Sequence, residues 1–414
     1  MLRCGFYEID ITPNIGDNVP GYFDAREAST IYDTLYAHAF AVQANGEPMI
    51  ILSLDTIVVE KKDANLIRKG INAATGVPMQ NISLCAIHTH TGGPVCDLYD
   101  CPRREPYCAF LVGRAIDAGI MAYRSMEDAK IGADSRNVEG IAFNRRFEMK
   151  DGSFRMNPGF LNPDIVRPID VTDPELVTVR IDRADGTPMG IIANFALHLD
   201  TIGVSVYSAD YPGVIRKSLR EKYGEKIGFL YMTAPCGNIN HFDVTKPRKE
   251  QKNWLSIGAV LSDAVLAAVD SIETVDTDIA CCTRSCTVGM MRRPTVEMAE
   301  VQPVENIRIE MMKAVDLPAD PVVMEIWTAR IGEIAFQMLP GEVFAYFGLD
   351  TKKRSGCKYT LVSELSNQNI GYIYTKEAEK QGGYESTPST YIIMNSDAGY
   401  QIVDAADANL KSLQ

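Results

Sequence analysis

Several features that mark particular protein classes are absent from this 414-residue sequence. It has no run of 18 consecutive apolar residues, so we expect no membrane-spanning helix and no stable insertion into a membrane. Residues 1–8 lack the long apolar region of a secretion signal, so we expect a cytoplasmic protein. Lys and Arg number 41 against 54 Asp and Glu, and the resulting net charge of −13 argues against a nucleic-acid partner.

Paired cysteine motifs are also missing. The ten cysteines include no CxxC pair, and reduced thiols are the default in an intracellular protein of this size. Cys96, Cys101 and Cys108 lie close together in the sequence, but their spacings match no common zinc module. We therefore expect neither a disulfide framework nor a cysteine-based zinc site.

Histidine is scarce, with five in the whole chain, and two of the five stand together. His88 and His90 follow residues 81–87, an apolar run that predicts a short buried strand. Residues two apart in an extended segment point to the same side, so both rings can face one cleft. The spacing alone is compatible with two structural histidines as well as with a metal or proton-transfer site.

The order of apolar and amphipathic segments predicts a layered α/β fold. Strand-like runs alternate with helical patterns, and 46% of the residues are hydrophobic, which is enough for one large core. We predict an α/β/α sandwich with a mixed sheet, formed by residues 1–414 as a single domain with an excursion at 291–320. Helices are expected over residues 61–75, 107–123, 210–223 and 252–272, and hairpins over 176–197 and 322–338.

Polar side chains gather after the predicted buried strands. His198, His241 and Glu342 each come shortly after such a strand, as do His88 and His90. In layered α/β folds, sites collect at one set of strand ends. Two histidines and a carboxylate are enough to hold zinc with an open position, where the metal activates water and polarises a carbonyl. The spacing of these residues in the sequence is equally compatible with a metal site and with no metal site.

Five short segments, taken in order, resemble the catalytic domain of the neutral/alkaline (non-lysosomal) ceramidase family. Together they span nearly the whole chain, and the ordered set is more specific than any member. Tyr372 and Tyr384 are twelve residues apart, which is the spacing of two tyrosines in the family pattern. The segments are Asp10-Ile11-Thr12-Pro13, Ile87-His88-Thr89-His90-Thr91-Gly92-Gly93-Pro94, Asn194-Phe195-Ala196-Leu197-His198, Leu339-Pro340-Gly341-Glu342, and Gly371-Tyr372 with Tyr384-Glu385.

The resemblance implies a metal centre with one Zn²⁺ per chain. The ligands that it implies are His88, His198, Glu342 and Tyr372. It also implies three residues that act beside the metal, by transferring a proton or by stabilising an oxyanion. These residues are His90, Arg145 and Tyr384.

The loop at residues 236–241 departs from the family pattern. Asn240 stands where the family has a serine needed for amide cleavage, and a carboxamide is neither a nucleophile nor an acid. His241 becomes a candidate catalytic residue, and we expect Asn238, Asn240, His241 and Asp210 to contact polar groups of the substrate. Cys236 is either a nucleophile or, as is more common, a buried structural thiol. We expect no counterpart of the family's C-terminal immunoglobulin-like domain.

Three functions are compatible with these observations. We predict a zinc-dependent hydrolase in which metal-activated water attacks an amide, ester or lactone of a small polar substrate. The first alternative is an N-acylsphingosine amidohydrolase, a ceramidase, which would cleave a short-chain ceramide in detergent. The second is a non-catalytic metal-binding homologue, in which His90→Ala and Tyr384→Phe would leave stability and function unchanged.

Overall fold

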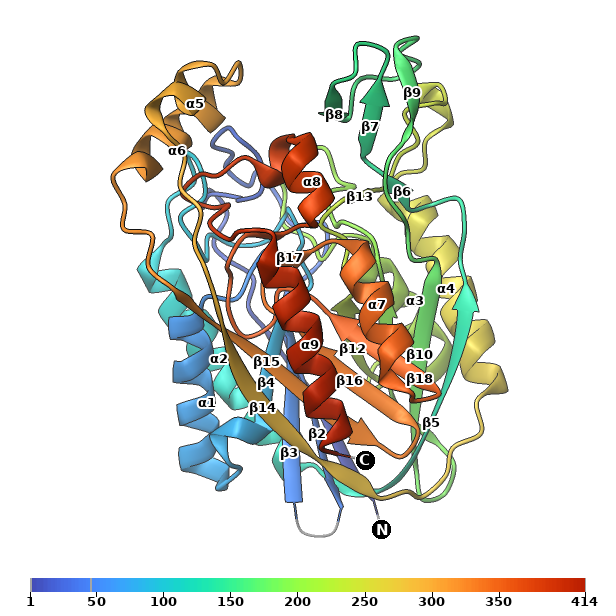
Figure 1. The fold of residues 1–414 in the computed structure, drawn as a ribbon. Coiled ribbons are helices and arrows are strands. Elements are labelled where there is room, and N and C mark those ends of the chain that lie inside the picture. The colour runs from blue at the N-terminus through green and yellow to red at the C-terminus, as the bar shows by residue number, and fades with distance from the viewer. Residues whose placement is uncertain (1, 45–46, 414) are drawn as a thin grey trace.

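The computed structural model describes residues 2–44 and 47–413 and is built in four layers (Figure 1). A layer of helices covers one face of a large mixed sheet, and a second sheet packs against the other face. Two further helices cover the outer face of the second sheet. The predicted layered α/β class with a mixed sheet is confirmed, and the second sheet is an additional layer.

The large sheet has eight strands and both of its faces are buried. The pairs at its two ends are parallel and the inner pairs are antiparallel. Most of its strands are apolar runs because both of their faces are covered, whereas Arg3–Asp10 and Glu127–Asn137 carry more polar residues and are partly exposed. In spatial order the strands are β12 (Gly228–Thr233), β11 (Pro188–Phe195), β10 (Glu175–Arg183), β5 (Glu127–Asn137), β1 (Arg3–Asp10), β2 (Tyr36–Ala44), β3 (Glu47–Leu54) and β4 (Ile82–Ala86).

The large sheet is curved so strongly that its two ends approach each other. The Ser53 hydroxyl, on β3, donates to the Tyr231 carbonyl on β12 at 2.5 Å. The Thr233 hydroxyl, at the end of β12, donates to the Ile87 carbonyl just after β4, also at 2.5 Å. The curvature therefore brings together chain segments that follow opposite edge strands.

The helices that cover the large sheet have apolar residues at helical spacing and defined ends, as the first of them illustrates. Residues Ala64, Ile67 and Ile71 of the first helix are buried at helical spacing. Gly76 ends that helix in the left-handed conformation, with φ of 76°, which glycine adopts without strain. The helices of this layer are α1 (Lys61–Thr75), α2 (Glu105–Arg124), α3 (Tyr211–Tyr223) and α4 (Trp254–Ser271).

The second sheet packs on the large one through a continuous apolar layer. Trp327, Phe336 and Leu361 of the second sheet meet Phe40 and Val42 of β2 in one buried cluster. Each large side chain buried in this way stabilises the fold by roughly 1.5–3 kcal/mol. The strands are β14 (Ile279–Gly289), β15 (Val322–Ile331), β16 (Ile334–Met338) and β18 (Tyr359–Ser363), and the covering helices are α7 (Ala345–Ser355) and α9 (Asp397–Lys411).

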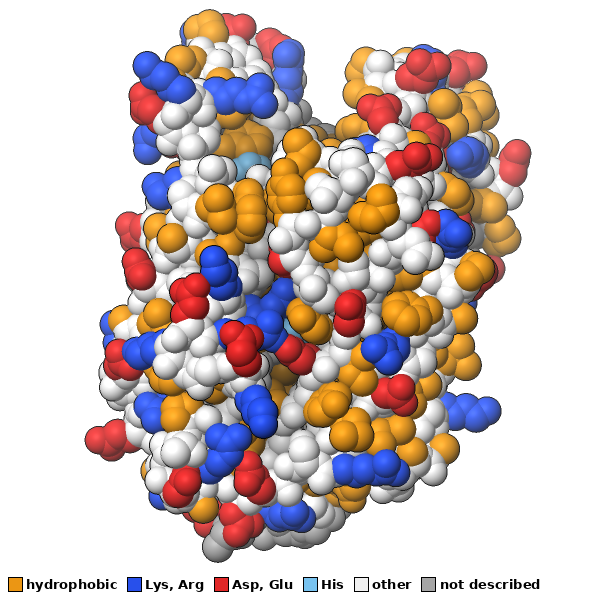
Figure 2. Space-filling model, turned by 180° about the vertical axis from the view of Figure 1, so that it is seen from behind, with side chains coloured by type: hydrophobic (Ala, Val, Ile, Leu, Met, Phe, Trp, Pro, Cys, Tyr) orange, Lys and Arg blue, Asp and Glu red, His pale blue; other side chains and the backbone are white. Residues whose placement is uncertain are grey.

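Two projections stand at the top of the molecule in Figure 1. One contains α5 (Val296–Glu300) and α6 (Glu305–Val315), within the excursion expected at residues 291–320. The other is a small sheet of β7 (Arg146–Met149), β8 (Phe154–Met156) and β9 (Ile165–Pro168). Figure 2 shows that the surface is hollowed between the two projections.

Among the residues that the structure describes, one helix is long and apolar enough to cross a membrane by length and composition. It is Arg248–Ser271, which includes α4. Core helices often pass the same test, and Ile257, Leu261 and Val265 of α4 are buried in the core between helices and sheet. In this structure α4 is a covering helix of the large sheet.

Candidate metal centre

The curvature of the large sheet brings three histidines to one point. His88 and His90 follow β4, and His198 follows β11. Their ring nitrogens lie within 4.8 Å of one another and could together hold a metal ion. His88 Nε2 lies 3.2 Å from His198 Nε2 and 3.4 Å from His90 Nε2. Glu342 Oε2 completes the cluster, at 3.4 Å from His88 Nε2 and 3.6 Å from His198 Nε2.

Backbone carbonyls orient all three histidine rings. The Nδ1 atoms of His88 and His90 lie 2.8 Å from the carbonyl oxygens of Ile57 and Gly21. His198 Nδ1 lies 3.1 Å from the Cys236 carbonyl oxygen. A carbonyl oxygen only accepts, so each Nδ1 carries a hydrogen, and each neutral ring presents the lone pair of Nε2 to the cluster. Three lone pairs and a carboxylate directed at one point suit a shared cation.

The Glu342 carboxylate gives an independent test of whether a metal fits. Its Oε1 accepts a hydrogen bond from the Tyr391 hydroxyl at 2.6 Å. Its Oε2 is buried and has no hydrogen-bond partner among the described residues. Leaving a buried acceptor without a partner is unfavourable, and a cation between Oε2 and the Nε2 atoms would satisfy it. The donor set of imidazoles and a carboxylate is one that zinc accepts.

The backbone at His88 is in an uncommon conformation. Its φ is 73°, in the left-handed region that residues other than glycine seldom occupy. The His88 N–H donates to the Thr56 carbonyl at 3.0 Å, which helps to hold this conformation. Strain of this kind persists where surrounding contacts determine the geometry, and it is concentrated at functional sites.

Tyr372 and Glu342 are direct neighbours in a short parallel pair, β17 (Glu342–Val343) and β19 (Tyr372–Ile373). Arg145 follows β6 (Phe143–Asn144), and its Nη2 donates to the Tyr372 hydroxyl at 3.0 Å. Arg145 Nη1 lies 3.4 Å from His198 Nε2, and Arg145 Nε donates to Glu385 Oε1 at 2.8 Å. The structure therefore places Arg145 and Tyr372 beside the histidine cluster.

Tyr384 also borders the cluster. Its ring meets the Tyr372 ring edge-on, with centroids 5.5 Å apart, and its hydroxyl lies 2.9 Å from the Tyr99 hydroxyl. Burial, reinforced by the nearby Glu342 carboxylate, raises the pKa of Tyr384 to about 12. Tyr384 is therefore a neutral hydrogen-bond donor around neutral pH.

The loop that precedes and includes β13 (Ile239–Asn240) holds a second set of predicted residues. Asn240 is buried, and its Nδ2 donates to Asn157 Oδ1 at 2.5 Å. The polar atoms of Asn238 and Asp210 are engaged within the protein, Asn238 with Asp170 and the Ala345 N–H, and Asp210 with Thr201 and the Tyr211 N–H. His241 instead pairs with Asp200 near the histidine cluster.

Cys236 has the environment of a buried structural thiol. It is fully buried, and its Sγ donates to Glu364 Oε1 at 2.9 Å. Burial, together with the Glu364 charge, raises the pKa of Cys236, so the thiol remains protonated. Because the thiolate is the nucleophilic form, these surroundings do not favour a nucleophilic role. Burial likewise raises the pKa of Glu364 to about 8.

Charge is distributed unevenly within the cluster. Burial, with a smaller effect of His88, lowers the pKa of His90 to about 3. Burial and the Arg145 guanidinium hold the pKa of His198 well below its usual range. Burial opposes ionisation of Glu342, but its interaction with His88 outweighs burial and lowers the pKa of that carboxyl. The same interaction outweighs burial at His88 and raises the pKa of that ring. The cluster thus offers the neutral imidazoles of His90 and His198 beside an ionised carboxylate.

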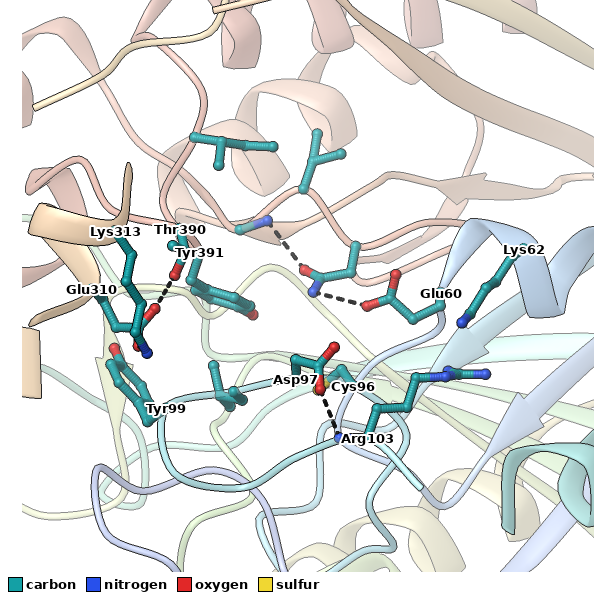
Figure 3. A pocket seen from close by; sticks show the side chains of 15 residues that line it. Glu60, Lys62, Cys96, Asp97, Tyr99, Arg103, Glu310, Lys313, Thr390 and Tyr391 are labelled. Atoms are coloured by element: carbon teal, nitrogen blue, oxygen red, sulfur yellow. Dashed lines mark hydrogen bonds and ion pairs between the residues drawn. The ribbon is translucent and has the colours of Figure 1, made fainter. Parts of the chain in front are cut away.

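A polar cavity of about 510 Å³ adjoins the cluster (Figure 3). Figure 3 shows Tyr99, Tyr391, Glu310 and Lys313 toward one end and Glu60, Lys62 and Arg103 toward the other. Two of these side chains connect the cavity to the candidate metal centre. They are Tyr391, which hydrogen-bonds Glu342, and Tyr99, which hydrogen-bonds Tyr384.

Several residues that shape the site were given no role from the sequence. Glu385 belongs to the matched segment Tyr384-Glu385, and Asp200 lies two positions after His198, so proximity to predicted residues was an available signal for both. Tyr391 and Tyr99 carried no comparable signal, because their contacts join segments far apart in the chain.

Comparison with known proteins identifies the fold. No protein-family model matches the sequence, and no curated protein matches it. Five chains of solved structures do match. Neutral ceramidase from Pseudomonas aeruginosa has a TM-score of 0.77 and 16% sequence identity, over all of this chain and 74% of that one. A ceramidase complexed with C2 has a TM-score of 0.76 and 16% identity, over all of this chain and 75% of that one. The chain therefore has the fold of the neutral ceramidases, as its motifs predicted.

Proposed function

We propose that this protein is a metal-dependent hydrolase that cleaves an amide, ester or lactone of a small polar substrate. The observation that carries the proposal is the unpartnered Oε2 of Glu342, which faces the Nε2 atoms of His88 and His198. We assign these three residues, with Tyr372, as ligands of one zinc ion. When bound there, zinc would activate water for attack and polarise the carbonyl of the scissile bond.

Residues beside the ligands would divide the remaining work. His90 is neutral, and its Nε2 lone pair points into the cluster, so it would accept a proton from the attacking water. Arg145 and Tyr384 would donate hydrogen bonds to the oxygen on which negative charge develops. Asn240, already bonded to Asn157, would orient the substrate through its remaining amide oxygen.

The cavity beside the centre favours a polar substrate. Ionisable side chains line it at both ends (Figure 3), and an alkyl chain placed there would separate these groups from water without giving them partners. Cleavage of a ceramide is the alternative, and the fold shared with ceramidases supports it. A metal-binding protein without activity is the second alternative.

The test combines metal analysis with a substrate panel. Elemental analysis of the purified protein should find about one zinc per chain, which His88→Ala should lose. His38→Gln should retain it, because His38 is a buried histidine outside the cluster. Short polar amides, esters and lactones should be hydrolysed by the wild type and by His38→Gln. Absence of metal after reconstitution with zinc would refute the proposal, and turnover of a short-chain ceramide alone would favour the ceramidase alternative.

A metal-loaded protein without turnover would leave the non-catalytic alternative. In that case His90→Ala and Tyr384→Phe should change neither metal content nor stability, since neither residue is an assigned ligand. If the protein is a hydrolase, both variants should bind zinc and lose activity by about 100-fold or more.

A further inference from the structure

Asp200 and His241 form a pair at the edge of the candidate centre. Asp200 Oδ1 lies 2.9 Å from His241 Nδ1. A carboxylate oxygen accepts, so Nδ1 carries the hydrogen and the ring is held in one orientation. No other described residue hydrogen-bonds His241, which leaves Nε2 available to a bound molecule. Both side chains are mostly buried, at 19% and 15% exposed.

The backbone places this pair next to the histidine cluster. Asp200 is two residues after His198, and its neighbour Leu199 accepts a hydrogen bond from the His90 N–H at 3.0 Å. The Tyr22 hydroxyl donates to the Asp200 carbonyl at 3.3 Å. The Tyr22 ring in turn meets the His90 ring edge-on, with centroids 5.5 Å apart. Asp200 is thus attached on two sides to residues that border the centre.

The pKa of His241 is displaced in the opposite direction to those of His90 and His198. Burial disfavours the charged ring, but the carboxylates of Asp200 and Asp210 outweigh burial and raise the pKa of His241. Phe242, whose ring packs edge-on against His241, carries no charge. In contrast, burial lowers the pKa of His90 to about 3, and the Nε2 atoms of His88 and His198 face the proposed metal.

Hydrolysis needs a proton donor as well as a base. When an amide or alkyl ester breaks, the leaving nitrogen or oxygen is a poor leaving group unless it is protonated as the bond breaks. His90, once it has taken a proton from the attacking water, can return that proton only to an atom within its reach. A second ring that already carries a proton can supply one to the leaving atom directly.

We propose that His241 donates the Nε2 proton to the leaving group and that Asp200 is its positioning residue. This inference rests on the proposed hydrolase function. As the bond from the acyl carbon breaks, its electron pair stays on the leaving atom, which takes the proton from Nε2. His241 is left neutral, with its Nδ1 hydrogen still bonded to Asp200, and solvent water returns the lost proton.

The test compares two esters of the same short acid, a p-nitrophenyl ester and an ethyl ester. p-Nitrophenolate leaves without protonation, whereas ethoxide does not. His241→Gln should therefore lose about 100-fold or more in kcat/KM on the ethyl ester and change little on the p-nitrophenyl ester. Asp200→Asn should show the same pattern to a smaller degree. Asp243→Asn, a carboxylate in the same loop bonded to Thr245, should leave both rates unchanged.

A second measurement does not depend on activity. Nitrogen chemical shifts of the His241 ring should show a pKa above the ordinary value of about 6.5, which Asp200→Asn should lower. Equal losses on both esters in His241→Gln, or a His241 pKa that Asp200→Asn leaves unchanged, would overturn the assignment. If the zinc-loaded wild type hydrolyses neither ester nor any of the polar substrates, the proposed function itself fails, and the proton-donor role fails with it.

Discussion

The hydroxyl of Tyr391 donates to Glu342 Oε1 at 2.6 Å and so turns Oε2 of the same carboxylate toward His88. Groups that orient a metal ligand in this way typically affect metal affinity by about 10–100-fold. We therefore expect Tyr391→Phe to bind zinc more weakly by that factor, measured by competition with a chelator. Tyr374→Phe is the matched control, because the Tyr374 hydroxyl bonds the Met394 carbonyl instead. Equal affinities in the two variants would contradict the orienting role.

Gly371 holds the strand pair that carries Tyr372. Its φ is 71°, and a Cβ there would lie 2.0 Å from the Tyr391 carbonyl oxygen. Gly371→Ala should therefore lower the free energy of unfolding and also displace Tyr372 and Tyr391, which reduces the bound zinc. Gly76 has a similar φ of 76°, but a Cβ there would have no atom within 4 Å. Gly76→Ala should cost only about 1–2 kcal/mol and retain zinc, as measured by urea denaturation and elemental analysis.

Arg145 and Glu385 form a buried ion pair, at 5% and 1% side-chain exposure. Arg145→Ala leaves Glu385 with only the longer contact to Arg146, whose Nε lies 3.6 Å from Glu385 Oε2, so the free energy of unfolding should fall by about 3 kcal/mol. Glu385→Gln added to Arg145→Ala should recover part of that loss, because it removes a buried charge that has lost its closer partner. Urea denaturation of the single and double variants measures both effects. If Glu385→Gln lowers the free energy of unfolding by the same amount in the Arg145→Ala variant as in the wild type, the two residues are not coupled.

His38 lies inside β2 between two carboxylates. Its Nδ1 is 3.3 Å from Glu8 Oε2 and its Nε2 is 3.6 Å from Asp55 Oδ2. Burial lowers the pKa of His38, but the Asp55 and Glu8 carboxylates outweigh burial and raise it. A raised pKa in the folded state means that the bound proton stabilises the fold.

The stabilisation from the proton on His38 should be fully present below the pKa of the unfolded state, about 6.5. It should be lost as the pH rises through the pKa of His38 in the folded protein. The difference in unfolding free energy between the wild type and His38→Gln should therefore shrink as the pH rises from about 6.5. Denaturant titrations at several pH values measure it. A difference that stays constant with pH would show that His38 does not titrate with folding.

Local patterns predicted the elements well, and for identifiable reasons. The helix at residues 61–75 has the predicted bounds because Gly76 supplies a left-handed stop after an amphipathic stripe. The hairpin predicted over residues 322–338 is likewise present, as the antiparallel pair β15 and β16. The position of His88 and His90 after a short buried strand followed from an apolar run interrupted by glycines and a proline.

The arrangement in space depends on contacts that no local pattern contains. The approach of β4 to β12 rests on the Ser53 and Thr233 hydroxyls, each bonded to a carbonyl more than a hundred residues away. The second sheet as a separate layer follows from packing between Trp327 and residues near the N-terminus. Composition is also a poor guide at residues 148–172, because strands β8 and β9 pair with β7 there despite many turn-forming residues.

The proposed ligands come from four segments that extend from His88 to Tyr372. His88 therefore leaves the ribosome long before Tyr372 is synthesised. During most of its synthesis the emerging chain holds only some of the proposed ligands. We expect zinc to be captured after translation has passed Tyr372 and the two sheets have joined. Pulse-labelled chains in a cell-free system should accordingly acquire resistance to proteolysis from added zinc only once Tyr372 has left the ribosome.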